Sequence, residues 1–104
     1  SHLPLDPPLV RTAPRLATLG EDIRPPYPDS MREAGQEASL KLRLTIDARG
    51  RVTSVDPVGA ADPVFLAAAR RHILRVWRYR PAMEGSNAVP AILTVTLKFE
   101  LGNA

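Results

Sequence analysis

The chain has 104 residues, a length that suits one domain around a single hydrophobic core. Its 14 basic and 11 acidic side chains leave a net charge of +3, too small an excess to indicate nucleic acid or anionic lipid without local clustering. The absence of cysteine excludes a disulfide framework, a thiolate zinc site and a cysteine nucleophile.

The first 22 residues have the composition of a linker end. Seven of the 11 prolines fall within the first 28 residues, and the leucines between them follow neither a helical nor a strand period. This predicts a disordered or extended, polyproline-like arm without packed structure over residues 1–22 and a folded domain over residues 23–104. The serine and histidine that open the chain resemble the remnant of a purification tag, so we expect the natural chain to continue upstream. A membrane anchor is expected there, because the longest apolar run, residues 64–69, is far shorter than the roughly 18 residues of a spanning helix.

A short helix and a strand follow the arm. Residues 25–28 are stiffened by prolines, and a short helix is predicted over residues 31–34, ended by Gly35. Within residues 40–46 every second side chain is apolar and those between are polar. This alternation is typical of a strand that buries one face.

A hairpin connects this strand to the next one. Residues 47–50 form a turn in which Gly50 can adopt a positive φ, and the return strand is predicted over residues 51–58. This strand contains Pro57, which has no amide hydrogen to donate to a neighbour. The return strand is therefore expected at an edge of the sheet.

The second helix has the clearest helical pattern. Asp62 and Pro63 are typical of a helix start, as N-cap and first helical residue. Apolar side chains then form one stripe, and arginines occupy the other face. The stripe consists of Phe65, Leu66, Ala69, Ile73, Val76 and Trp77. We expect a core that includes Phe65, Ile73, Trp77, Leu42, Leu44 and Phe99.

The last strand, residues 91–101, alternates again, with Leu93, Val95, Leu97, Phe99 and Leu101 on its apolar face. The predicted fold is α+β, with three strands and both helices on one face of the sheet. If the third strand pairs with the first, the spatial order is second, first, third, and the central strand is antiparallel to both neighbours. The last strand then forms an edge whose outer amides and carbonyls have no partner.

A long edge strand with unpaired backbone groups favours aggregation, so proteins usually shorten, charge or cover such edges. This edge therefore indicates either pairing between two copies or the capture of an extended peptide. The alternative is an edge without a function, protected by the charges of Lys98 and Glu100.

Several motifs occur in a fixed order along the chain. They are Pro26-Tyr27-Pro28, Gly50-Arg51-Val52, Ala67-Ala68-Ala69, Trp77-Arg78-Tyr79 followed by Pro81-Ala82, Gly85, Val89-Pro90, and Phe99-Glu100-Leu101. Together they resemble the C-terminal domain of the TonB family over about residues 23–101.

The resemblance implies a periplasmic domain of an energy transducer, tethered to an inner-membrane helix that the ExbB-ExbD proton motor drives. It implies a partner, the TonB box of outer-membrane transporters for nutrients such as siderophores or haem, bound by strand addition. Carried over by position, the binding surface comprises Ala91, Ile92, Leu93, Thr94, Val95, Thr96, Leu97 and Lys98, with Tyr27 and Pro28 beside it. A basic residue common two positions after this proline is Ser30 here, so we expect its electrostatic contact with the transporter to be either lost or shifted to Arg32.

Residues for catalysis or metal binding are few. His72 flanks the apolar stripe without an Asp or Glu at ligand spacing on its helix, so we interpret it as a residue at the core margin. The serines have no histidine base in sequence context, and the glycines are isolated, so no phosphate-binding loop is predicted. We expect no enzymatic activity, no cofactor and no metal.

Two alternative functions remain. The arginines of residues 70–80 are interleaved with aromatic side chains, a pattern that can hold phosphates and stack bases. Because Trp77 falls on the apolar stripe, we interpret these arginines as a solvated helix face and expect no nucleic-acid partner. In the other alternative, two copies join their last strands into a homodimer.

Overall fold

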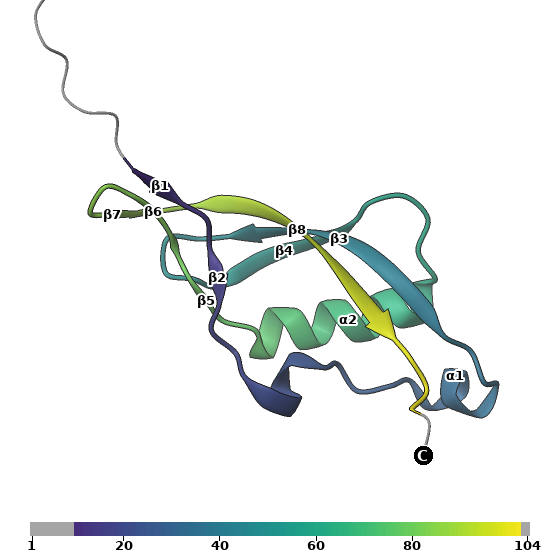
Figure 1. Cartoon of the computed structure of the whole chain (residues 1–104). Coiled ribbons are helices and arrows are strands. Elements are labelled where there is room, and N and C mark those ends of the chain that lie inside the picture. The colour runs from purple at the N-terminus through teal and green to yellow at the C-terminus, as the bar shows by residue number, and fades with distance from the viewer. Residues whose placement is uncertain (1–9, 103–104) are drawn as a thin grey trace, which may run out of the picture.

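The computed structural model describes residues 10–102 and has the predicted α+β architecture (Figure 1). The central strand β3, Ala38–Ile46, lies between β4, Val52–Pro57, and β8, Ala91–Phe99. Both neighbours run antiparallel to β3, which confirms the predicted spatial order of second, first and third strand. The strand that comes last in the sequence is therefore an edge of this sheet.

The pairing of β3 with β4 explains why a proline is tolerated at the opposite edge. The amide of Val58 donates to the carbonyl of Lys41 at 2.8 Å, and Leu42 lies opposite Pro57. Hydrogen-bonded and non-hydrogen-bonded pairs alternate along an antiparallel ladder, so the nitrogen of Pro57 faces away from β3. No ladder hydrogen bond is lost.

The turn between β3 and β4 is held by a carboxylate. One side-chain oxygen of Asp47 accepts from the amides of Arg49 and Arg51 at 2.8 and 2.9 Å. The hydrogen bond from the amide of Arg51 is the main reason that the pKa of Asp47 lies below its ordinary value. Gly50 has a φ of +84°, and a Cβ at this position would lie 1.9 Å from the carbonyl oxygen of Tyr79. Glycine is required there both by the backbone conformation and by the neighbouring chain.

The long helix α2, Pro63–Val76, covers one face of the sheet (Figure 1). Its start is as predicted, because the Asp62 side chain accepts from the amides of Val64 and Phe65 at 2.8 and 3.3 Å. The apolar stripe of α2 meets the alternate side chains of the strands. The core includes Leu40, Leu42, Leu44, Ile46, Phe65, Ile73, Trp77 and Phe99, each at most 4% exposed.

A short helix, α1, Asp29–Glu33, lies near the C-terminal end of β8 (Figure 1). It begins two residues earlier than predicted, with Pro28 at its cap, and Gly35 follows it with a φ of +67°. None of its residues is fully buried, but Met31 packs against the core. This helix therefore closes one end of the apolar layer.

The described part of the predicted linker is extended and also paired. Strand β1, Arg11–Thr12, pairs with β6, Ala82–Glu84, which forms a hairpin with β7, Asn87–Val89. Strand β2, Arg15–Leu16, pairs with β5, Tyr79–Arg80, and the 3₁₀ turn η1, Gly20–Ile23, leads to the domain. The sequence did not predict these pairs, because two-residue strands joined through their backbones leave no side-chain period. Residues 1–9 of the predicted linker lie outside the described residues.

Candidate peptide-binding edge

The outer side of β8 is open in the described part of the chain. Over residues 10–102, β8 pairs with β3 only, in a register that runs from Ala38 opposite Phe99 to Ile46 opposite Ala91. Figure 1 shows β8 as a long, twisted strand, and the strand order β4-β3-β8 places it at the edge of the sheet. An unpaired edge of nine residues is long for a globular protein.

The register decides which backbone groups of β8 face outward. In an antiparallel strand the N–H and C=O of one residue point to the same neighbour, and successive residues alternate. Lys41 bonds to β4, so Leu42 bonds to β8, where it lies opposite Val95. Val95 therefore faces β3. The residues whose amide and carbonyl face away from the sheet are Ile92, Thr94, Thr96 and Lys98.

Successive side chains of β8 point to opposite faces of the sheet. Thr94, Thr96 and Lys98 are exposed on the face away from α2. On the other face, Leu93 and Val95 are only half-buried, although both pack against the core. Half-buried apolar side chains beside an open edge leave apolar surface that a further strand would cover.

The arm lies next to the first residues of β8. Residues 11–14 and residues 91–93 line the same small hollow. The edge from Thr94 to Lys98 is outside this hollow. The sequence does not predict this contact, since nothing in residues 11–14 marks them as neighbours of β8.

The other end of β8 meets the Tyr27 region. The Tyr27 ring lies edge-on to Phe65 and Phe99, with 5.7 Å between ring centroids in each pair. Its hydroxyl donates to the carbonyl of Gln36, and the Arg32 guanidinium lies 5.1 Å from the ring centroid. Desolvation raises the pKa of the Tyr27 hydroxyl, and Glu37 adds to this effect. Tyr27 and Arg32 thus form a cluster at the C-terminal end of β8.

The remaining candidates for chemistry have structural contacts. The Nε2 atom of His72 lies 2.6 Å from the carbonyl oxygen of Asp22, which requires this nitrogen to carry the proton. Trp77 is 4% exposed and donates from Nε1 to the carbonyl of Ile23 at 2.8 Å. A base cannot stack on a ring buried in this way. Within residues 10–102, no three acidic or histidine side chains are grouped so as to hold a metal ion.

Comparison with known proteins gave one family. The family described as Gram-negative bacterial TonB protein C-terminal matches residues 23–101, which is more than half of the chain. No curated protein matches the sequence. None of the helices in residues 10–102 combines the length and the apolarity that crossing a membrane requires.

Proposed function

Because the chain belongs to the family of TonB C-terminal domains, we propose that it binds the TonB box of outer-membrane transporters by adding this peptide to the open edge of β8. The family is one of TonB-like periplasmic domains related to transport, not of enzymes. Its members are expected to interact with outer-membrane transporters. The specific binding mode is our proposal.

The observation that carries the proposal is the free ladder of Thr94, Thr96 and Lys98. These residues offer three amides and three carbonyls in the spacing of an antiparallel or parallel partner. Each backbone hydrogen bond contributes about 0.5–1.5 kcal/mol, so the pairing accounts for most of the affinity of a short peptide.

The side chains beside the edge determine what the peptide contains. A guest strand places every second side chain on the face of Leu93 and Val95, where apolar surface is exposed. Its other side chains lie beside Thr94 and Thr96. The guest is therefore an extended segment with apolar residues at alternate positions, and Tyr27, Pro28 and Arg32 contact the end that passes beyond Lys98.

The proposed energy transduction rests on membership of the TonB family. We infer that the natural chain continues from the arm to an inner-membrane anchor driven by ExbB-ExbD, so that a pull reaches the peptide held on β8. This would open transporters for nutrients such as siderophores or haem. Support comes from family membership and from the arm, which leads through η1 into the domain.

Proline substitution tests the binding mode because only outward amides are proposed to bind. Thr96→Pro removes an outward donor and leaves the hydrogen bonds of Val95 to β3 intact. We expect the variant to stay folded and to bind TonB-box peptides at least tenfold more weakly, measured by chemical-shift titration of the labelled domain. The matched control, Thr96→Val, retains the amide and should bind within about twofold of the parent.

Two results would contradict the proposal. One is normal peptide affinity in Thr96→Pro, and the other is a set of shifted resonances that excludes residues 93–98. A homodimer through paired β8 strands would use the same amides. Sedimentation at several concentrations distinguishes it, because Thr96→Pro would then shift the chain toward monomer in the absence of any peptide.

A further inference from the structure

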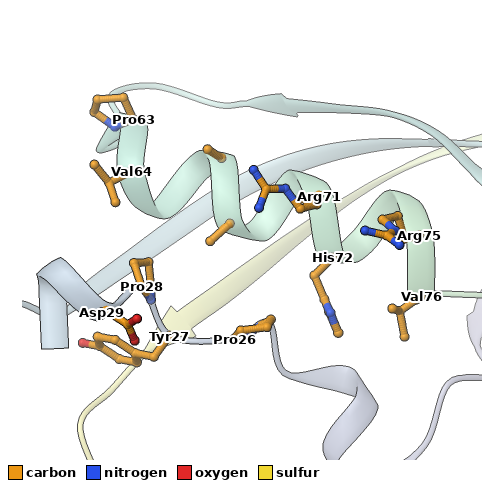
Figure 2. Close-up of a pocket in the computed structure, with 12 residues that line it drawn as sticks. Pro26, Tyr27, Pro28, Asp29, Pro63, Val64, Arg71, His72, Arg75 and Val76 are labelled. Carbon is orange, nitrogen blue, oxygen red and sulfur yellow. The ribbon is translucent and has the colours of Figure 1, made fainter.

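A second recess lies away from the outer edge of β8, between α2 and the segment of residues 26–29 (Figure 2). It has a volume of about 910 Å³ and takes none of its lining from residues 91–98. Figure 2 shows α2 forming one wall and the Pro26–Asp29 segment forming the opposite wall. Only Tyr27 and Pro28 belong to both this recess and the proposed edge site.

The recess is hollow because small residues lie in the middle of its helical wall. Ala67 and Ala68 occupy the middle of the helical wall, and Val64 and Val76 stand near its two ends. Both valines are exposed, at 40% and 36%. The opposite wall presents the rings of Pro26 and Pro28, which have no amide hydrogen to offer a ligand. The surface is therefore apolar and poor in backbone donors.

The rim of the recess is basic. Arg71 and Arg75 lie one helical turn apart on α2, and both are exposed. The part of the chain that the structure describes places no carboxylate within 4.0 Å of either guanidinium. Asp29, on the far wall, is the one acidic residue of the lining, against two arginines. His72 points across the recess from α2 and is held by the carbonyl of Asp22 (Figure 2).

The length of the recess fits a short peptide. From Val64 to Val76 the helix rises about 18 Å, at 1.5 Å per residue. An extended chain covers this distance in about five or six residues. A small anion would leave the apolar walls uncovered.

We propose that this recess binds an extended peptide segment that carries apolar side chains and carboxylates. The apolar side chains cover Val64, Ala67 and Val76, and the carboxylates pair with Arg71 and Arg75. The site goes beyond the proposed function, because it does not depend on the backbone of β8. A partner that occupied both sites would be held at two places that flank Tyr27.

A probe peptide that cannot add to β8 tests this site separately. The capped hexapeptide Leu-Glu-Pro-Leu-Glu-Pro has prolines that interrupt strand pairing and favour an extended chain. We expect it to shift the amide resonances of residues 64–76 and of Tyr27 and Asp29. The same peptide with glutamine in place of glutamate should bind about tenfold more weakly, since two exposed ion pairs contribute a few-fold each.

Three variants give the matched comparison. Arg71→Gln combined with Arg75→Gln should weaken the glutamate peptide about tenfold and leave the glutamine peptide unchanged. Ala67→Leu fills the recess at an exposed helical position and should weaken both peptides. Arg43→Gln removes a cation from the open face of the sheet and should have no effect.

Several outcomes would overturn the proposal. Equal binding of the two peptides would exclude the role of Arg71 and Arg75, and shifts confined to β8 would exclude the recess. Tighter binding of an oligothymidylate to the same residues would assign the recess to anionic polymers, and concentration-dependent shifts without any peptide would assign it to a second copy of the chain. Thr96→Pro should bind the probe normally, so a failure here is distinguishable from a failure at β8.

Discussion

At the scale of single residues, Gly50 leaves no room for a side chain. The backbone at Gly50 has a left-handed φ of +84°, which is strained for any residue with a Cβ. A Cβ there would also lie 1.9 Å from the Tyr79 carbonyl oxygen. We expect Gly50→Ala to lower the free energy of unfolding by about 3 kcal/mol or more, measured by urea denaturation.

Gly35 provides the control for this prediction. It has a similar φ of +67°, but a Cβ at Gly35 would meet nothing within 4 Å. Gly35→Ala should therefore lower the free energy of unfolding by only about 1 kcal/mol, because the backbone conformation alone is unfavourable. Equal losses in the two variants would contradict the close approach of Tyr79.

Of the two constraints on Gly50, the sequence can predict the positive φ but not the close approach of Tyr79. A turn of Asp47-Ala48-Arg49-Gly50 predicts the positive φ, because the relevant contacts are local. The contact with Tyr79 joins residues 29 positions apart and depends on how β5 returns to the hairpin. No periodicity records such a contact.

At the scale of elements, the hairpin of β3 and β4 should be sensitive to acid. The fold lowers the pKa of Asp47 below its ordinary value of 3.8, chiefly through the hydrogen bond from the Arg51 amide. The ionised form therefore stabilises the fold fully above pH 3.8, and this contribution is lost as the pH falls through the lower folded value. Asp47→Asn still offers an oxygen to both amides but does not titrate.

We expect the stability difference between the parent and Asp47→Asn to shrink as the pH falls from 5 to 2. Urea denaturation at fixed pH values measures it. Parallel stability curves over this range would show that the Asp47 carboxylate has no special role in the turn.

The elements also show why some of the fold was predictable. Strands β3 and β8 and helix α2 each span nine residues or more, so their side-chain periods stand out. Strands β1, β2, β5, β6 and β7 have two or three residues, too few for a period. The predicted edge strand followed from Pro57 and from the strand count. The recess beside α2 was not predicted, because Ala67 and Ala68 are helix formers whose sequence gives no sign of a hollow.

At the scale of the whole molecule, the arm and the folded domain contribute very differently to the core. Every fully buried residue of residues 10–102 lies at or after Leu40, and Ile23, the first residue of the family match, accepts the indole hydrogen bond of buried Trp77. We therefore propose that residues 23–104 fold without the arm. The arm adds the packing of Leu16, the β1–β6 and β2–β5 pairs, the hydrogen bonds of Thr18 with Arg78 and the bond between His72 and the Asp22 carbonyl.

Deletion of residues 1–22 should lower the free energy of unfolding by about 2–3 kcal/mol, because one partly buried leucine and the largely solvent-exposed hydrogen bonds of two short strand pairs are lost. Urea denaturation measures the loss, and peptide titration should give an unchanged affinity at β8. Leu16→Ala in the full chain measures the contribution of this side chain to stability separately from that of the backbone pairing. An unfolded product of the deletion would place the boundary of the domain upstream of Ile23.

The two-residue pairs of the arm have a mechanical consequence. Tension applied at Val10 would load β1 and β2 first, and each is held by far fewer hydrogen bonds than the nine-residue ladder of β3 and β8. The arm would detach while the sheet stayed intact, and the point of attachment would move from Val10 to Ile23. The segment released in this way, up to about 40 Å of extended chain, would lengthen the arm before the ladder of β3 and β8 is loaded.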